Sequence, residues 1–173
     1  MMTSIVLTVI GPDRPGLVSA VSDQANKFGA NWADSLMANL AGQFAGIVHL
    51  QVPAKNADAL IAALIALESP GMRITAAKGT EADGSAPSRR IKLDLIGQDR
   101  PGIIHSISNQ LASHGVSIEK LQTQIASGAM SGEQMFQMHA VLVVPAGLAD
   151  DKLRDGLEGL ANELMVDIEL AQN

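Results

Sequence analysis

The sequence predicts an α+β protein built from two domains in tandem, each with the element order βαββαβ. Two observations support this prediction. The segment from Gly11 to Leu17 (GPDRPGL) returns 86 residues later as the segment from Gly97 to Ile103 (GQDRPGI). In each copy an apolar strand-like run enters the segment, and apolar residues at the three- and four-residue spacing of a helix follow it. The chain is therefore arranged around a strand-to-helix turn that occurs twice.

Six elements are predicted in the first copy. A β-branched run at residues 5–10 is typical of a strand that is buried on both faces or lies in the middle of a sheet. The helix that follows, at residues 15–28, ends at Gly29, where a left-handed residue is favoured. Alternating apolar residues at 44–52 predict a further strand. The remaining elements are a strand at 30–40, a helix at 58–67 and a strand at 72–77.

The second copy repeats this order, with strands at 91–96, 116–125, 136–144 and 166–170 and helices at 101–114 and 153–164. Pro145 follows Pro53 by 92 residues rather than 86, so a hairpin around residues 127–133 holds six extra residues, which loops absorb at little cost. Two helices on one face of a four-stranded antiparallel sheet form the ferredoxin-like arrangement. The other face of each sheet carries residues such as Ile47 and Val141, and two copies can cover it edge to edge or face to face.

A stretch of small and turn-forming residues without periodicity separates the two copies. Such a composition is typical of an exposed, flexible linker. The predicted boundaries are a first domain at 1–79, a linker at 80–90 and a second domain at 91–173.

Composition limits the classes of function. The net charge is −6 and the aromatic fraction is 2%, which argues against direct nucleic-acid binding, because that binding depends on cations and on aromatic stacking. The chain has no cysteine, so disulfides, thiol nucleophiles and cysteine-ligated metals are excluded. No signal peptide and no apolar run near 20 residues is seen. We expect a cytoplasmic protein.

The repeated turn has the chemistry of an anion site. Asp13 and Asp99 stand where an N-cap carboxylate accepts backbone N–H groups, and a proline follows in the first turn. Alternatively, the helix begins at the proline and the arginine is the capping residue, because the residue before a proline avoids the α region. Gly16 or Gly102 comes next, and glycine in a first turn costs roughly 1 kcal/mol relative to alanine unless something must approach the backbone. Free N–H groups and a helix dipole then suit an anion; the alternative is a glycine that only lets the helix pack on its sheet.

No enzyme is predicted. No histidine pair has metal-ligand spacing with a carboxylate, and no Ser-His-Asp order recurs between the copies, so no catalytic residue, metal or cofactor is expected. A carboxylate that caps a helix stays ionised, which suits recognition of an ammonium group better than proton transfer. The two motif arginines are either carboxylate ligands or solvated side chains. His105, just beyond Gly102, is either an exposed helix residue or a ligand and pH-responsive group.

These residues carry a family resemblance. The βαββαβ order with a Gly-x-Asp-Arg-Pro-Gly turn after the first strand resembles the ACT domain, a small amino-acid-sensing module of metabolic regulation. A free-standing pair of this length is similar to the glycine cleavage system transcriptional repressor family, and the resemblance covers essentially the whole chain outside the linker. Related ACT domains also sit beside catalytic domains, in formyltetrahydrofolate deformylase and in the uridylyltransferase that modifies nitrogen regulatory proteins. The sequence contains no such catalytic domain.

The resemblance implies that a small amino acid, glycine or serine, binds at an interface between ACT domains, formed by the first turn and the start of the second strand. The matching residues are Asp13, Arg14, Pro15, Gly16 and Leu17 in the first copy, Asp99, Arg100, Pro101, Gly102 and Ile103 in the second, and Asn31, Trp32 and Ser117 at the second strands. The asparagine common at the start of the second strand is Asn31 in the first copy, but its counterpart is Ser117. We therefore expect two unequal sites, with the Gly16 turn the stronger.

The resemblance further implies a transcriptional regulator of glycine and one-carbon metabolism. It is expected to act through a DNA-binding protein partner and to form a homo-oligomer. The alternative is an ACT scaffold that has lost ligand affinity and only mediates association.

Overall fold

The computed structural model describes residues 1–80, 87–129 and 132–172. The chain forms two compact units, Met1–Asp83 and Gly84–Asn173, called here unit 1 and unit 2. Residues 81–86 of the predicted linker lie outside the described residues, as do 130 and 131 of the predicted hairpin insertion.

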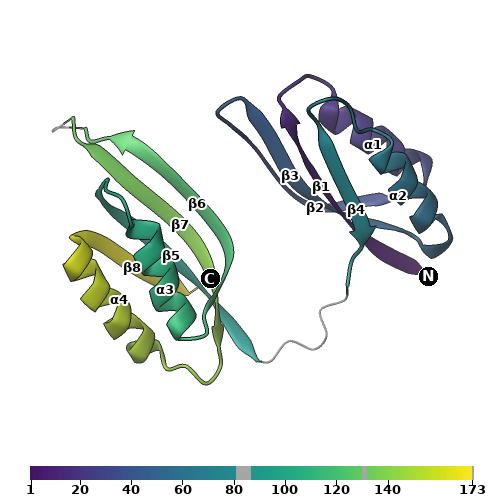
Figure 1. Cartoon of the computed structure of the whole chain (residues 1–173). Helices are drawn as coiled ribbons and strands as arrows, with labels where there is room; N and C mark the ends of the chain where they lie inside the picture. The colour runs from purple at the N-terminus through teal and green to yellow at the C-terminus, as the bar shows by residue number, and fades with distance from the viewer. Residues whose placement is uncertain (81–86, 130–131, 173) are drawn as a thin grey trace. The chain divides into compact units, whose positions relative to one another are not determined.

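Both units have the predicted element order (Figure 1). Unit 1 contains β1 (Met2–Pro12), α1 (Leu17–Lys27), β2 (Asn31–Leu40), β3 (Gln43–Pro53), a short 3-10 turn η1 (Ala54–Asn56), α2 (Ala57–Ile65) and β4 (Arg73–Lys78). Unit 2 contains β5 (Ser88–Gln98), α3 (Ile103–Ser113), β6 (Ser117–Ser127), β7 (Gln134–Pro145), α4 (Asp150–Leu164) and β8 (Val166–Gln172). The prediction of an α+β protein with two ferredoxin-like βαββαβ units in tandem is confirmed.

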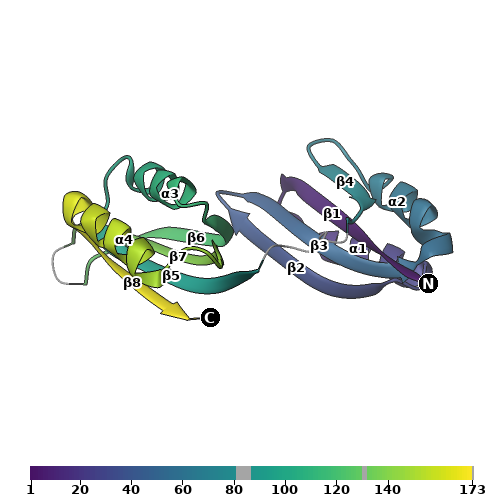
Figure 2. The ribbon, with the colours of Figure 1, turned by 90° about the horizontal axis from the view of Figure 1, so that it is seen from below.

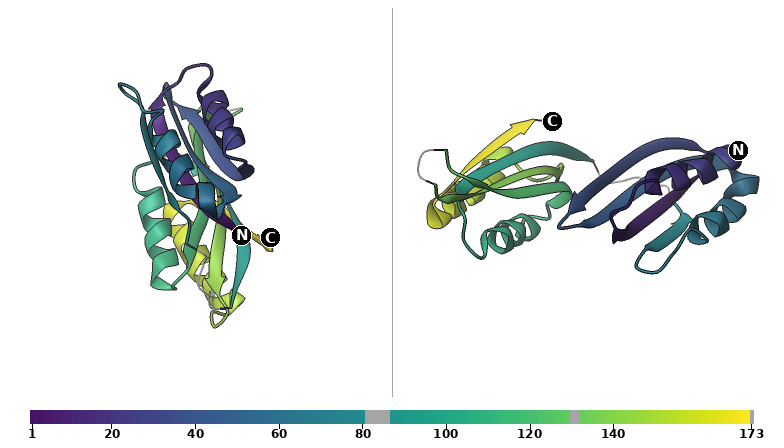
Figure 3. Two further views of the ribbon diagram at one scale, coloured as in Figure 1. Left: turned by 90° about the vertical axis from the view of Figure 1, so that its right-hand side faces the viewer. Right: turned by 90° about the horizontal axis from the view of Figure 1, so that it is seen from above.

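Each unit has one four-stranded antiparallel sheet, with the strand orders β2-β3-β1-β4 and β6-β7-β5-β8. In each unit the two helices lie along the same face of the sheet and leave the other face bare (Figure 2, Figure 3). The first strands are longer than predicted, because pairing continues from Met2 opposite Pro53 and from Ser88 opposite Pro145. Strand β5 therefore takes in three residues that the sequence placed in the linker.

The core of unit 1 lies between its sheet and its helices. The strand residues Ile5, Leu7 and Val9 alternate inward and are at most 1% exposed, as period-two alternation requires. Strand β1 lies inside the sheet, as one alternative predicted, but it is not buried on both faces, since Val6 and Ile10 are 39% and 49% exposed. Its segment at residues 5–10 is apolar except for Thr8, although only one face of the strand is covered.

The helices pack through the predicted stripes. Buried residues of α1 and α3 recur at the same positions 86 residues apart: Leu17, Val21 and Ala25 in α1, and Ile103, Ile107 and Leu111 in α3. Full burial of one such Leu, Ile or Val side chain contributes roughly 1.5–3 kcal/mol. Gly29 and Gly115 end the two helices with φ of 67° and 68°, which confirms the predicted left-handed residue.

The first glycine of each motif is required by close packing. A Cβ atom built on Gly11 would lie 2.9 Å from the Cα of Met72, and one built on Gly97 would lie 2.4 Å from the Cγ1 of Val166. In both units the last strand begins beside this glycine, at the end of the central strand. The absence of a side chain therefore lets the fourth strand approach.

We expect Gly11→Ala to lower the free energy of unfolding by about 1–3 kcal/mol, because the new methyl group meets backbone atoms that cannot move independently. The matched control is Gly159→Ala in α4, where a Cβ atom meets nothing within 4 Å. That substitution should raise stability by about 0.5–1 kcal/mol, because alanine is the better helix former. Urea unfolding followed by circular dichroism measures both changes. Equal effects of the two substitutions would contradict the packing role of Gly11.

Candidate functional site

A left-handed glycine makes the strand-to-helix turn in both units. Gly16 is the N-cap residue of α1 with φ 88° and ψ 0°, and Gly102 is the N-cap of α3 with φ 96° and ψ −4°. A Cβ atom at either position meets nothing within 4 Å, so a side chain would have room there. Glycine is required because the backbone is left-handed at this position. Both capping alternatives from the sequence, the aspartate and the arginine, are wrong, and Pro15 and Pro101 precede the helices.

The turn leaves backbone donors without protein acceptors. The carbonyl of Gly16 accepts the first helical hydrogen bond from the N–H of Ala20, at 2.9 Å. No described residue accepts from the N–H groups of Leu17, Val18 and Ser19, and no side chain caps the helix. The first turn also carries no acidic residue to neutralise the helix dipole. This end of α1 is therefore an exposed, positively polarised group of donors, which suits an anion.

The N-terminus of α3 has the same structure. The carbonyl of Gly102 accepts from the N–H of Ser106 at 3.0 Å, and the first turn of the helix carries no acidic residue. His105 lies in this first turn, where its Nε2 lies 3.1 Å from the side-chain amide of Asn109, and its side chain is exposed. Both helices thus present the same backbone donors.

Asp13 ties the turn to the hairpin between β2 and β3 and does not cap the helix. Its carboxylate accepts from the side-chain amide of Asn39 at 2.6 Å, and its N–H donates to the carbonyl of Gly42 at 3.2 Å. The backbone contact recurs in unit 2, where Asp99 donates to the carbonyl of Gln134 at 2.8 Å. The side-chain contact does not recur, because the residue in the place of Asn39 is apolar (Ile125).

The motif arginines have different partners in the two units. Arg100 donates from Nη2 to the carbonyl of Glu163, at the C-terminal end of α4, at 3.3 Å. Arg14 reaches the start of β4, where its Nη2 lies 3.8 Å from the sulfur of Met72. A thioether is a weak acceptor and a helix-terminal carbonyl is a strong one. The guanidinium of Arg14 is therefore the more available of the two to a ligand.

Two of the predicted site residues belong to the core. Leu17 and Ile103 are 5% and 2% exposed, so a ligand at the turn would meet their N–H groups rather than their side chains. Trp32 is half-buried against the core of unit 1, and its indole N–H donates to the hydroxyl of Ser35 at 3.2 Å. Asn31, its neighbour, pairs opposite the exposed Gln51, so the two residues belong to opposite faces of the sheet.

Within unit 1 the structure does not bring Asn31 to the turn. Asn31 pairs opposite Gln51, which pairs opposite Ser4, near the start of β1. The turn follows the other end of β1, beyond Gly11. These two levels of the sheet are seven residues apart, about 23 Å along a strand. A site that uses both the turn and Asn31 therefore needs two domains.

Ser117 occupies the place of Asn31 in unit 2, but its surroundings differ. A β-bulge follows both residues and leaves Ala33 in unit 1 and Glu119 in unit 2 unpaired in the ladder. Glu119 accepts from Nε and Nη2 of Arg90 at 2.8 and 2.7 Å, and this hydrogen bonding lowers the pKa of the Glu119 carboxyl. The start of β6 is therefore occupied by an ion pair that unit 1 lacks.

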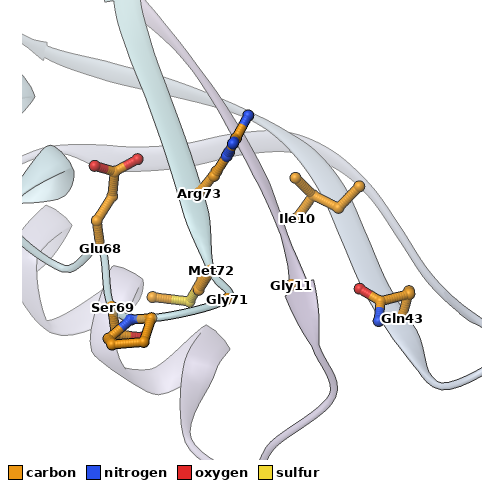
Figure 4. Close-up of a pocket in the computed structure, with 9 residues that line it drawn as sticks. Ile10, Gly11, Gln43, Glu68, Ser69, Gly71, Met72 and Arg73 are labelled. Atoms are coloured by element: carbon orange, nitrogen blue, oxygen red, sulfur yellow. The ribbon is translucent and has the colours of Figure 1, made fainter.

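An open depression lies beside Gly11, the first residue of the motif, and was not predicted. It has a volume of about 910 Å³, and it lies where the end of β1 meets the loop before β4. Figure 4 shows the charged side chains Glu68 and Arg73 at its wall, with Ile10 and Gln43 across from them. Glu68 also accepts from the N–H of Ile74 at 2.9 Å. The sequence signal was the Ser-Pro-Gly break between two residues of opposite charge.

The described residues show no metal site and no membrane-spanning helix. Across residues 1–80, 87–129 and 132–172, no three His, Asp or Glu side chains gather closely enough to hold a metal ion. Within the same ranges no helix combines the length and apolar character needed to cross a membrane. What the two turns offer is backbone donors, arginine and aspartate, which are binding groups.

Comparison with known proteins agrees with this fold. Residues 3–72 match the ACT domain family. The glycine cleavage system transcriptional repressor of Escherichia coli is 27% identical over 168 residues, which cover 92% of this chain and 85% of the repressor. The crystal structure of an unknown protein from Galdieria sulphuraria has a TM-score of 0.86 at 29% identity, over 100% of this chain and 99% of that one. A proposed glycine cleavage system transcriptional repressor, at 18% identity and a TM-score of 0.67 over 100% and 99% of the chains, shares the fold.

The contact between Asp13 and Asn39 gives a test of how the turn is held. We expect Asp13→Ala to lower the free energy of unfolding by about 0.5–1.5 kcal/mol, because it removes a side-chain hydrogen bond and leaves the amide to water. Asp99→Ala is the matched control and should change stability by less than about 0.5 kcal/mol, as is usual for an exposed side chain. Denaturant unfolding measures the free energy of unfolding of both variants and of the wild type. A larger loss for Asp99→Ala would contradict the assignment.

Proposed function

We propose that this tandem ACT-domain protein, which resembles the glycine cleavage system transcriptional repressor of Escherichia coli, is a regulatory protein that binds a small amino acid. It would act in the cytoplasm on glycine and one-carbon metabolism, through a protein partner rather than by direct DNA contact and without catalysis. The single observation that carries the ligand proposal is the left-handed glycine turn. In each unit it leaves a row of helix N–H groups exposed and unneutralised.

The α-carboxylate of the ligand is the group that the turn would hold. The N–H groups of Leu17, Val18 and Ser19 have no protein acceptor among the described residues, and the helix dipole favours negative charge at this end. Arg14 precedes them by three to five residues in the chain, and its guanidinium contacts only a weak acceptor among the described residues. Hydrogen bonds from charged donors to a carboxylate are roughly twice as strong as neutral ones, so Arg14 adds affinity.

The α-ammonium group would be recognised from a second domain. Because Asn31 lies about 23 Å from the turn along its own sheet, the proposed site joins the turn of unit 1 in one copy of the chain to the β2 start of unit 1 in a second copy. The side-chain oxygen of Asn31 accepts from an ammonium group, and its amide also donates to the carboxylate. Glycine and serine are the proposed ligands, in keeping with the name of the Escherichia coli relative.

The two turns would bind unequally, with the Gly16 turn the stronger. Unit 1 supplies Asn31 where unit 2 supplies Ser117, which lies beside the ion pair of Arg90 and Glu119. Arg14 is available to a ligand, whereas Arg100 donates to a carbonyl of α4. Loss of one hydrogen bond to a charged ligand costs roughly 1.5–3 kcal/mol, which is about tenfold or more in affinity.

A protein partner is the proposed route to transcription. The net charge of −6 opposes binding to the phosphate backbone. An interaction scaffold without ligand affinity is the second candidate. It is favoured by the exposed apolar residues on the bare face of the unit 1 sheet, such as Leu36 and Ile47.

Ligand binding is tested first on the unmodified chain, by thermal unfolding with each of the twenty amino acids. A ligand that binds only the native state must raise the melting temperature, and glycine or serine should do so. The exchange pair Asn31→Ser and Ser117→Asn then tests the site by calorimetry. Both residues are exposed, so folding should be unaffected. Asn31→Ser should weaken binding about tenfold, and Ser117→Asn should not weaken it.

Two outcomes would contradict this proposal. If no amino acid raises the melting temperature, the scaffold is the better account. If glycine or serine binds but Asn31→Ser leaves the affinity unchanged, the start of β2 is not part of the site. Arg14→Met and Arg100→Met extend the comparison, since only the former should reduce affinity.

A further inference from the structure

The bare face of the unit 1 sheet, called here face 1, is apolar. Leu36 on β2 pairs opposite Ile47 on β3, and Ile47 pairs opposite Thr8 on β1, so one row of small and apolar side chains crosses three strands. Leu36 and Ile47 are 54% and 53% exposed, and Val6 and Ile10 flank Thr8 along β1. Face 1 therefore holds a continuous apolar surface that nothing within unit 1 covers.

The corresponding face of unit 2, called here face 2, is polar. The two sheets have the same register, so their residues can be compared position by position. Three matching pairs are Val6 and Lys92, Leu36 and Gln122, and Ile47 and His139. His139 is also hydrogen-bonded to Asp94 on face 2. The same fold thus forms with charged and amide residues at these positions, so folding does not require the apolar residues of face 1.

We infer that face 1 is a dimer interface that packs against face 1 of a second copy of this chain. Face 2 is a poor cover, because packing it on an apolar sheet would bury Lys92, Asp94 and Lys120, and burial of charge is costly. Pairing of sheet edges would leave face 1 in water. A second face 1 presents the same apolar rows, and two-fold packing of identical patches is the commonest form of homo-oligomer.

The size of face 1 fits a dimer of moderate affinity. Four strands spaced about 4.8 Å apart, over the seven residues from Ser4 to Ile10, give a footprint of roughly 19 Å by 23 Å, or about 440 Å². Side chains that stand out from the sheet bury more than this flat area. Stable interfaces bury about 800 Å² per partner, so the flat footprint of face 1 falls below the standard size, in the range of weak interfaces. A dissociation constant in the micromolar range is expected.

Polar groups stand at the ends of face 1. At one end His49 contacts Asp34 at 3.3 Å and the hydroxyl of Ser4 at 3.0 Å. At the other end Arg73 pairs opposite Ile10. An apolar centre with a polar rim is the usual anatomy of an interface. The rim contacts of His49 are already made within unit 1, so they do not oppose association.

The test uses a matched pair of substitutions on interior strands, where edge pairing is not disturbed. Sedimentation equilibrium of the full chain over about 5–200 μM should show dimers for the wild type. Ile47→Lys should raise the dissociation constant at least about tenfold, because it buries two unpaired charges in the dimer. His139→Lys, the equivalent change on face 2, should leave it unchanged. Circular dichroism should show both variants folded, since both side chains are exposed.

A cross-linking experiment gives a second readout that does not depend on destabilising the interface. The chain has no cysteine, so Thr8→Cys introduces a single thiol at the centre of face 1. Packed sheets lie about 10 Å apart, so a bis-maleimide of that reach should join two Thr8→Cys chains. Asp94→Cys, the matched position on face 2, should remain uncross-linked.

Three results would overturn the inference. A wild type that stays monomeric to about 200 μM would assign face 1 to another molecule. Dimers that survive Ile47→Lys would place the interface elsewhere. Cross-links through Asp94→Cys rather than Thr8→Cys would place it on face 2. None of these measurements uses an amino-acid ligand. Failure of the ligand proposal is therefore distinguishable from failure of the dimer proposal.

Discussion

The left-handed glycine between the central strand and the first helix of each unit is the constraint on which the rest of the structure depends. Gly16 and Gly102 adopt φ of 88° and 96°, a conformation that costs other residues roughly 1–2 kcal/mol. The reversal places α1 and α3 back over the strands that precede them. It also leaves the first N–H groups of each helix without side-chain caps. One backbone conformation thus sets both the packing of the helix and the chemistry of its exposed end.

The rest of the motif holds this turn from two sides. Asp13 connects it to the β2–β3 hairpin through Asn39, and Arg14 extends from it to Met72 at the start of β4. Gly11 lets β4 approach the end of β1, because a side chain there would collide with Met72. Gly11, Asp13 and Arg14 therefore each have a structural partner. Ligand binding, as proposed, uses the backbone donors that these contacts leave free.

The sequence was sufficient for the fold but not for the details of the turn. Three sequence patterns predicted the core: the 86-residue offset, the helical stripe from Leu17 to Ala25 and the alternation of β3. They do so because residues on a buried face recur with the period of the helix or strand. The capping residue was missed, because a glycine in the first turn of a helix and a left-handed glycine before it look alike in a sequence. The distance between Asn31 and the turn depends on strand direction, which a local motif does not contain.

The two units have diverged where the fold leaves them free to do so. Their buried positions remain apolar in both, whereas the bare faces of the two sheets differ, as Ile47 and His139 illustrate. The turn residues differ least, but their partners differ: Arg14 meets a thioether and Arg100 a carbonyl. A duplicated domain can thus keep one core and divide the other tasks, with unit 1 proposed for association and for the stronger ligand site.

The central claim is that the glycine turn binds the carboxylate of a small amino acid through helix N–H groups. The most direct measurement is a titration of the ¹⁵N-labelled chain with glycine and with serine. Binding is monitored through the chemical shifts of the backbone amides in NMR spectra. The account predicts the largest shifts at the amides of Leu17, Val18 and Ser19, and smaller ones at the corresponding amides of α3. Shifts centred on the depression around Glu68 and Arg73, or no shifts at saturating ligand, would contradict it.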